Sequence, residues 1–403
     1  MRTLKSMKLL FVHERFGAMA GAEVNAFLTA EELRKRGHST AILHGEPTGK
    51  GEDAWRTTFQ PSFAIPETAS GAAVERALAE FQPDVIYVHK MEDPGVIEAL
   101  VKSGKPLVRM VHDHDLYCMR SYKYHPLTRK ICTRPASPHC IFPCGAVIAR
   151  NRGGGLPLKW VSYGEKLREI ALNRRFHRMV VATEYMREEL LRNKFDPAKI
   201  EIHSPVPPTP AGLLEASFSD RNLIIYSGQI IRGKGVDVLM EALALVGEKF
   251  ECEVFGDGNH RAHCEFLRDK FSLAGKVHFR GFVPRNEVLA AYSDASLAVV
   301  SSVWPEPFGA VGLEAMHHGL PVVAFDAGGV REWLADGENG FLAPWMDRKA
   351  FAGRVAELLR DKALARKMGA RGRAMAAEKF DFARYIGALE AMFTQVLAEN
   401  GKP

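Results

Sequence analysis

The chain has 403 residues, which corresponds to two or three domains at about 150 residues each. Hydrophobic residues make up 46% and charged residues 25%, values typical of soluble globular proteins that exclude a disordered, collagenous or disulfide-stapled chain. The net charge of +6 is unevenly placed, because residues 1–205 hold 31 Lys or Arg and 23 Asp or Glu, whereas the remaining residues hold 23 and 25.

The basic surplus is densest between Leu116 and Gly164, where eight Lys or Arg occur without any acidic residue. Such a stretch suits an anionic partner, although a basic surface without a ligand fits the pattern equally well. No apolar run approaches the roughly 18 residues that span a bilayer, and the run at 9–12 is too short for a signal peptide. We therefore expect a cytoplasmic protein, and a peripheral contact with the inner face of the cell membrane stays open.

The first half of the chain predicts an alternating series of strands and helices. A continuous apolar run at Met7–His13 is typical of a buried parallel strand, and a Gly/Ala-rich loop leads from it into a helix that ends at Gly37. Further strands are predicted at Ser39–Leu43, Asp84–His89, Pro106–His112 and Arg178–Thr183.

A proline-rich linker and a second series follow. His203–Pro210 holds four prolines in eight residues, which neither a helix nor a central strand tolerates. Strands then alternate with helices again from Asn222 onwards, so we predict two doubly wound, Rossmann-like parallel-sheet α/β domains that face a cleft. The predicted domains are residues 1–205, with the basic insert at about 116–164 and joined by a C-terminal helix at 382–403, and residues 206–381.

The stretch Ser296–Phe325 carries the most informative pattern. A buried strand ends there, the loop WPEPFG follows, and a helix begins whose free N–H groups suit a phosphate. Glu306 and Glu314 flank this turn with seven residues between them, and carboxylates accept hydrogen bonds from the hydroxyl groups of ribose or hexose. In the alternative interpretation, Glu306 is only a charge at the start of the helix and Glu314 lies on a solvated helix face.

The segment EPFGAVGLEAMHHGLPVVAFDAGGVREWLADGENGFL resembles the signature of the family 4 retaining nucleotide-sugar glycosyltransferases, which have the GT-B fold. The shared features are two glutamates with seven residues between them, a G-x-P-V-V strand, a Gly-Gly loop and an N-G-(F/L)-L segment. The resemblance implies that Glu306 lies near the donor sugar and that Glu314 binds the ribose hydroxyls. It also implies main-chain contacts to the sugar and diphosphate from Phe308, Gly309, Ala310 and Val311.

A second stretch places Arg232 and Lys234 in a glycine-bearing loop between a strand and a helix, where cations suit a diphosphate. The alternative interpretation is that both side chains are solvated cations of the loop and bind no ligand. The family pattern is a Gly-Arg pair at the strand end and a Lys-Gly pair that opens the helix. Lys234–Gly235 matches this pattern, but Gln229 occupies the place of the arginine. The resemblance therefore implies a catalytic Lys234, and we expect Arg232 to take over the missing charge at the diphosphate.

Two further positions of the N-terminal half match the family. Ala20–Gly21 stands where the family has two adjacent glycines, which makes Gly21 a candidate contact of the donor phosphate. The strand ending at VHDHD carries His112, which corresponds to the family's histidine near the donor sugar. The resemblance implies that His112 polarises or positions sugar hydroxyls, whereas a histidine with satisfied hydrogen bonds is the alternative.

Four of the six cysteines lie within 27 residues, inside the acid-free stretch. They are Cys118, Cys132, Cys140 and Cys144. Four thiols in a loop-rich insert fit a tetrahedral structural zinc, although the gaps of 13, 7 and 3 residues differ from the paired spacing of a zinc ribbon. Free thiols and disulfides are the alternatives. Certain bacterial members of the family carry a cysteine-bearing insert after the strand that ends at His112. This resemblance implies that the cysteine cluster is inherited rather than accidental.

The resemblance covers residues 7 to about 390 and implies a retaining hexosyltransferase. Such an enzyme moves a sugar from a nucleotide diphosphate-sugar to a glycan or lipid-linked acceptor, without a catalytic metal or other required cofactor, in the assembly of cell-surface polysaccharide or glycolipid. The basic insert suggests an anionic membrane surface as a further partner, and no nucleic acid is expected. A nucleotide-sugar epimerase of the same fold and a zinc-containing nucleic-acid-binding protein are the alternative functions.

Overall fold

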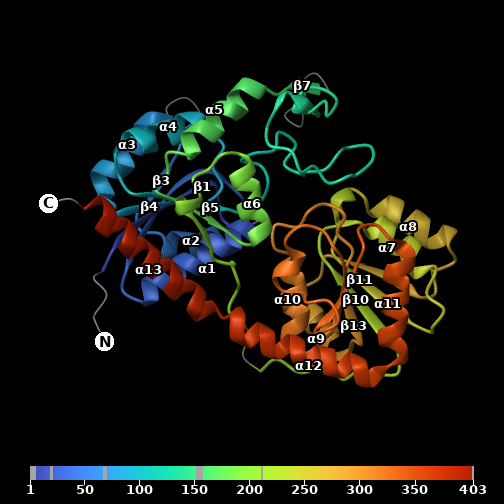
Figure 1. Cartoon of the computed structure of the whole chain (residues 1–403). Helices are drawn as coiled ribbons and strands as arrows, with labels where there is room; N and C mark the ends of the chain where they lie inside the picture. Colours follow the sequence, from blue (N-terminus) through green and yellow to red (C-terminus); the bar gives the residue numbers. More distant parts are fainter. Residues whose placement is uncertain (1–5, 19–20, 67–69, 151–157, 210–211, 402–403) are drawn as a thin grey trace. The chain divides into compact units, whose positions relative to one another are not determined.

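The computed structural model describes residues 6–18, 21–66, 70–150, 158–209 and 212–401. The chain divides into two compact units (Figure 1). Unit 1 consists of Met1–Ser121, Thr133–Pro207 and Phe382–Pro403, and unit 2 of Tyr122–Cys132 and Pro208–Asp381. The sequence analysis assigned the whole basic insert to the N-terminal domain, whereas the structure groups Tyr122–Cys132 with unit 2, because side chains of this segment are buried against that unit.

Unit 1 is built on a seven-stranded parallel sheet with the order β3-β2-β1-β4-β5-β8-β9. Its central strands are buried throughout their length, as the continuous apolar runs predict for a sheet covered on both faces. The strands are β1 (Lys8–Phe16), β2 (Ser39–Pro47), β3 (Ser62–Ala64), β4 (Val85–Val88), β5 (Leu107–Val111), β8 (Arg178–Val181) and β9 (Ile200–Ile202). The helices are α1 (Gly21–Lys35), α2 (Glu52–Thr58), α3 (Ser70–Phe81), α4 (Pro94–Lys102), α5 (Tyr163–Asn173), α6 (Glu184–Arg192) and α13 (Phe382–Asn400).

Unit 2 is built on a six-stranded parallel sheet with the order β12-β11-β10-β13-β14-β15. Its strands are β10 (Leu223–Ser227), β11 (Glu251–Phe255), β12 (Val277–Gly281), β13 (Leu297–Val300), β14 (Val322–Phe325) and β15 (Gly340–Ala343). Its helices are α7 (Val236–Leu243), α8 (Arg261–Lys270), α9 (Arg285–Asp294), α10 (Ala310–His317), α11 (Arg348–Arg360) and α12 (Lys362–Lys379), with short 3₁₀ turns at Arg232–Lys234 and Gly329–Glu332. The predicted pair of parallel-sheet α/β domains is confirmed.

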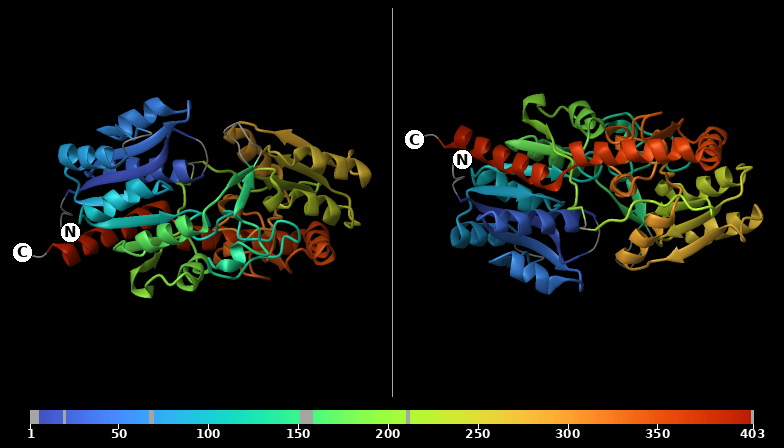
Figure 2. Two further views of the ribbon diagram at one scale, coloured as in Figure 1. Left: turned by 90° about the horizontal axis from the view of Figure 1, so that it is seen from above. Right: turned by 90° about the horizontal axis from the view of Figure 1, so that it is seen from below.

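The last helix, α13, belongs to unit 1 and packs along it (Figure 2). A buried glutamate anchors the helix there. Glu390 is 4% exposed and accepts a hydrogen bond from Arg36 at 2.7 Å, and its other oxygen lies 2.9 Å from Nε2 of His38. Tyr385 on the same helix accepts a hydrogen bond from Asn25 of α1. A buried carboxylate requires such partners, and they fix the position of the helix on its unit.

A small antiparallel hairpin stands apart from the large sheets. It pairs β6 (Ile148–Arg150) with β7 (Leu158–Trp160) and belongs to unit 1. Among the helices in the described part of the chain, none has both the length and the apolar character needed to cross a bilayer.

Candidate active site

The predicted donor-site residues of unit 2 lie where the order of its strands reverses. β10 and β13 are neighbours at the centre of the sheet, and the chain moves outward from them in opposite directions. In open α/β sheets, ligands bind beyond the carboxyl ends of strands at such a switch point. The loop after β10 carries Lys234, and the loop after β13 carries Glu306.

Lys234, which is half-buried, and the buried Glu306 form an ion pair at this point. Nζ of Lys234 lies 2.6 Å from Oε1 of Glu306, which is 3% exposed. The same oxygen accepts hydrogen bonds from the Ser302 hydroxyl and, at 2.9 Å, from the Trp304 indole. Burial alone raises the pKa of Glu306, but Lys234 and these two donors outweigh it and hold the pKa below its ordinary value. The carboxylate is therefore ionised, and its Oε1 accepts three hydrogen bonds.

Glycine at position 235 allows the two loops to approach each other. The carbonyl of Gly233 accepts hydrogen bonds from the backbone of Val303 at 2.9 Å and of Trp304 at 3.0 Å. Gly235 has a φ of 65°, and a Cβ added there would lie 2.1 Å from the carbonyl oxygen of Ser301. No other residue fits this conformation and this contact, which explains the Lys-Gly pair in physical terms.

A second glycine loop holds the backbone of Glu306. Its N–H donates to the carbonyl of Ala327, and its carbonyl accepts from the N–H of Gly329 at 2.6 Å. Gly328 has a φ of 70°, and a Cβ there would lie 2.6 Å from the Glu306 nitrogen. The Gly-Gly loop after β14 therefore clamps the residue that carries the carboxylate.

The first turn of α10 rests on a tryptophan that the sequence analysis did not identify. Trp333 is completely buried, and its indole donates a 2.6 Å hydrogen bond to the carbonyl of Phe308. Gly309 caps the helix with a φ of 81°, and a Cβ added at Gly312 would lie 2.1 Å from the indole ring. The side chain of Phe308 is buried, whereas Gly309, Ala310 and Val311 are half-buried.

Glu314 projects from the middle of α10 and is also paired. Its Oε1 accepts a hydrogen bond from Arg285, at the start of α9, over 3.1 Å. Burial raises the pKa of Glu314, and Arg285 opposes this only in part. Arg285 was not singled out from the sequence, because a cation at the start of a helix carries no local signal.

Arg232 occupies a different environment from Lys234. Its guanidinium donates hydrogen bonds to the backbone carbonyls of Pro126 and Leu127, the latter at 3.3 Å. Among the residues that the structure describes, no carboxylate lies within ion-pair distance of Arg232. Gln229, in the place of the family's arginine, is exposed.

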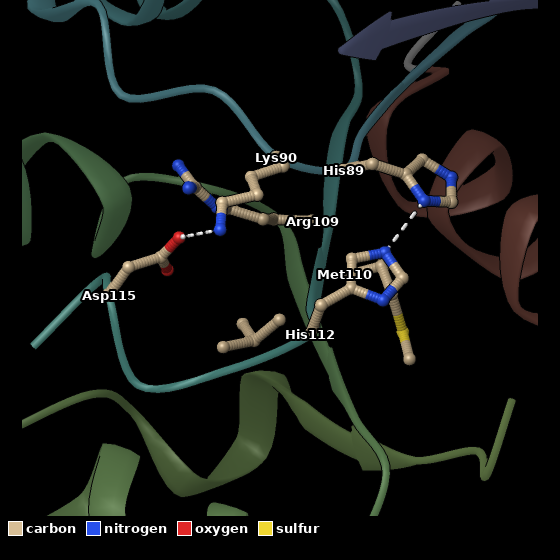
Figure 3. Close-up of a pocket in the computed structure, with 7 residues that line it drawn as sticks. His89, Lys90, Arg109, Met110, His112 and Asp115 are labelled. Atoms are coloured by element: carbon tan, nitrogen blue, oxygen red, sulfur yellow. Dashed lines mark hydrogen bonds and ion pairs between the residues drawn. The ribbon is translucent and has the colours of Figure 1, made fainter. Parts of the chain in front are cut away.

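His112 lies in unit 1, in a small polar pocket beyond the ends of β4 and β5 (Figure 3). Its Nε2 is 2.9 Å from Nδ1 of His89, and burial lowers the pKa of His112 to about 3. Both histidines are therefore neutral at physiological pH, since burial also lowers the pKa of His89. The pocket is lined by His89, Lys90, Arg109, Met110, Val111, His112 and Asp115.

Two aspartates share the Lys90 ammonium beside this pocket. Nζ of Lys90 lies 2.9 Å from Asp113 and 3.2 Å from Asp115. Burial and the neighbouring Asp115 raise the pKa of Asp113, because two carboxylates this close resist simultaneous ionisation. Gly21, the other predicted contact in this unit, is the exposed first residue of α1; Ala20 beside it lies outside the described residues.

The four cysteines of the insert do not form a recognisable metal centre in the described part of the chain. All four are half-buried, and none belongs to a group of three ligands within 4.8 Å of one another. One such group does occur in unit 2, with Asp237, His260 and His263. The Asp237 carboxylate in that group is already neutralised by two bonds from Arg129 of the same unit, so a cation there would face a guanidinium.

Comparison with known proteins agrees with the geometry. Residues 19–206 match the family model described as "Glycosyltransferase Family 4", and residues 215–375 match "Glycosyl transferases group 1". Over 186 residues the chain is 34% identical to the putative glycosyltransferase EpsD of Bacillus subtilis, which covers 45% of this chain and 48% of that protein. Over 184 residues it is 28% identical to the N-acetyl-alpha-D-glucosaminyl L-malate synthase of Bacillus anthracis, covering 45% and 48%. The chain thus spans about half the length of these curated relatives.

Solved structures match nearly the whole chain. Anabaena Alr3699/HepE, crystallised with UDP and glucose, superposes with a TM-score of 0.72 over 96% of this chain and 100% of that chain, at 19% identity. Sucrose-phosphate synthase from Thermosynechococcus elongatus gives 0.72 over 98% and 100%, at 18% identity. Together with the two parallel-sheet units, these likenesses identify the fold as GT-B, as predicted. The family matches support a glycosyltransferase and do not favour the epimerase or nucleic-acid-binding alternatives.

The packing of α10 on Trp333 can be tested with one methyl group. We expect Gly312→Ala to destabilise unit 2 by about 2 kcal/mol and to lower its melting temperature by about 5 °C, because the buried, hydrogen-bonded indole cannot move away. Gly275→Ala is the matched control, since a Cβ there meets nothing within 4 Å. Thermal unfolding followed by circular dichroism gives both values. Equal melting temperatures of the two variants would contradict this account of the helix turn.

Proposed function

We propose that the protein is a retaining glycosyltransferase that transfers a hexosyl group from a nucleoside diphosphate-sugar to a glycan or lipid-linked acceptor. The observation that carries the proposal is the Lys234–Glu306 pair at the switch point of the unit 2 sheet, beside the first turn of α10. Cations and free helix N–H groups at such a point suit a diphosphate, and carboxylates suit sugar hydroxyls. Alr3699/HepE, of the same fold, was crystallised with UDP and with UDP-glucose, which supports a nucleotide-sugar donor.

In the proposed reaction, the bond between the anomeric carbon and the β-phosphate oxygen breaks. The acceptor hydroxyl oxygen bonds to the anomeric carbon on the same face, and the leaving phosphate oxygen accepts the hydroxyl proton. Lys234, Arg232 and the α10 turn stabilise the negative charge that develops on the diphosphate, so catalysis needs no divalent cation. This front-face route retains the anomeric configuration.

His112 contributes hydrogen bonds rather than charge in this proposal. Its pKa of about 3 keeps the imidazole neutral, and Nε2 is already engaged by His89. Among the described residues, no hydrogen bond engages Nδ1, which leaves this nitrogen for a sugar hydroxyl. A neutral imidazole can position a hydroxyl group through a hydrogen bond and adds no charge to the pocket.

The donor can be identified with a panel of UDP-, GDP-, ADP- and dTDP-sugars. At a concentration of about 100 times its Kd, the correct donor stabilises the fold by about 2.7 kcal/mol and raises the melting temperature. Turnover of that donor in the presence of EDTA should match turnover without it. No shift with any of the four donors would contradict the proposed function.

Substitutions of the ion pair test the site directly. We expect Glu306→Ala and Lys234→Ala each to lower kcat by about 100-fold or more, because each removes charge or hydrogen bonds aimed at the reacting groups. Initial rates of sugar transfer measure the effect, and circular dichroism verifies the fold. Glu338→Gln and Lys349→Ala, two exposed residues of the same unit, are the matched controls. Near-normal rates in both test variants would overturn the site.

We further propose that the acceptor is reached at an anionic membrane surface, in polysaccharide or glycolipid assembly. The β6–β7 hairpin supports this, because Trp160 and Leu158 lie on one face of β7 and Ile148 pairs directly opposite Trp160. The three side chains are 73%, 58% and 47% exposed. The sequence from 148 to 160 also holds three Lys or Arg and no acidic residue. Exposed Trp and Leu beside cations are typical of interfacial membrane contacts.

Vesicle binding tests this proposal. The chain should bind vesicles that contain anionic phospholipid and dissociate as NaCl rises from about 0.05 to 0.5 M, since salt screens the attraction. Replacing both Trp160 and Leu158 with Ala should weaken binding about tenfold or more through lost apolar insertion. Leu245→Ala, at an exposed leucine of unit 2, serves as control. Salt-insensitive binding, or none, counts against the membrane surface.

A structural zinc on Cys118, Cys132, Cys140 and Cys144 stays a prediction from their clustering in the sequence. No step of the proposed reaction depends on it. Metal analysis of the purified protein tests it: a bound zinc predicts about one equivalent per chain, and less than about 0.2 equivalents contradicts it. Removal of a structural zinc should lower the melting temperature.

A further inference from the structure

The segment Tyr122–Cys132 belongs to unit 2, although the residues before and after it in the sequence belong to unit 1. Three hydrogen bonds within it, from His125 to Lys130, from Arg129 to His125 and from Cys132 to Lys123, close it into a compact loop. The proposed reaction gives this segment no role. Its contacts nevertheless converge on the loop that carries Arg232 and Lys234.

A buried ion pair anchors the segment. Arg129 is 8% exposed and Asp237, in the first turn of α7, is 7% exposed. The guanidinium donates two parallel hydrogen bonds to the carboxylate, at 3.1 and 2.5 Å. Bidentate pairs of this kind fix orientation as well as distance. Burial raises the pKa of Asp237, but Arg129 and His260 outweigh it and hold the pKa below its ordinary value, so the carboxylate is ionised.

Aromatic packing extends the contact toward the candidate site. A Cβ added at Gly233 would lie 3.4 Å from the Tyr124 ring and 3.2 Å from the Trp304 ring, so Gly233 is enclosed between the two side chains. Tyr122 lies beside Trp304 with ring centroids 6.5 Å apart. The Trp304 indole donates a hydrogen bond to Glu306, so this one side chain connects the segment to the Lys234–Glu306 ion pair.

The segment also determines how Arg232 is held. The guanidinium donates to the carbonyls of Pro126 and Leu127, which are neutral acceptors. Lys234 is compensated by Glu306, whereas in the described part of the chain no carboxylate pairs with Arg232. Arg232 is therefore oriented without being neutralised, and it keeps a full positive charge for an anion.

We propose that Tyr122–Cys132, anchored by Arg129 on Asp237, is a part of the donor-binding unit that positions Arg232 for the diphosphate. The proposal rests on the proposed function for the identity of the anion. It assigns Arg129 as a positioning residue, because Arg129 acts through the segment rather than on the ligand. It also gives a structural reason why Gln229 can stand where the family has an arginine: the cation comes from position 232 and is held in place by the segment.

Nucleotide affinity measured in a double-mutant cycle tests the proposal. Arg129→Gln combined with Asp237→Asn replaces the ion pair by neutral amides, so that no buried charge is left alone. Arg232→Ala removes the positioned cation, and a third variant carries all three substitutions. UDP, GDP, ADP and dTDP are titrated into each protein by calorimetry. Lys130→Ala is the matched control, because this lysine of the same segment is exposed.

We expect the amide pair and Arg232→Ala each to weaken binding of the recognised nucleotide about tenfold, as expected for loss of a charge-assisted hydrogen bond. In the Arg232→Ala background the amide pair should have less than about a twofold further effect, because the segment acts through Arg232. An equal loss in both backgrounds would show a merely structural role and would overturn the proposal, as would an Arg232→Ala variant of unchanged affinity.

Hydrogen exchange provides a readout that does not depend on any nucleotide. The amides of Arg129 and Cys132 should be protected in the unmodified chain and exchange at least about tenfold faster in the amide-pair variant. Fast exchange in the unmodified chain would overturn the anchoring itself. If the segment is protected but none of the four nucleotides binds, the proposed function fails and Arg232 loses its assigned ligand, so the two failures are distinguishable.

Discussion

The candidate site depends on one constraint, which is that the buried Glu306 carboxylate must be kept ionised at the switch point of the unit 2 sheet. A charge in that position is costly unless it is paired and hydrogen-bonded, and its Oε1 collects an ammonium, a hydroxyl and an indole N–H. The surrounding loops have the conformations that bring these donors to the carboxylate. Gly235 lets the Lys234 loop reach the loop after β13, and the Gly-Gly pair after β14 fixes the backbone of Glu306.

This arrangement has an electrostatic consequence for an anionic ligand. Lys234 and Glu306 together carry no net charge, so the pair offers direction and hydrogen bonds more than long-range attraction. In the proposed function a diphosphate needs additional positive potential, which Arg232 and the first turn of α10 supply at the switch point. The polar pocket of unit 1 has a different charge balance: His112 and His89 are neutral, and Lys90 is compensated by Asp113 and Asp115.

The parts of this structure that could be predicted from sequence are those in which geometry restricts residue type. Buried parallel strands require continuous apolar runs, so the sheets were evident. The glycines at 235 and 328 were identified through the family resemblance, and the structure gives their physical reason, which is positive φ and close backbone contact. Arg285, Trp333 and the Arg129–Asp237 pair were not identified. Their partners lie far along the chain, 108 residues apart for the last pair, and no local pattern marks them.

Partners that are distant in the sequence also explain why the basic insert was interpreted as a charged surface for an anionic partner. A run of cations without nearby acids suggests a charged surface, but charge is neutralised in space rather than along the sequence. Arg129 is buried on Asp237, Lys123 is buried, and Arg120 donates to the carbonyls of Cys144 and Gly145. Part of the surplus therefore serves to hold the insert together and to attach one segment of it to unit 2. Among the cations of the insert whose side chains are described, Lys130, Arg134 and Lys159 are exposed, and Lys159 lies between the exposed Leu158 and Trp160.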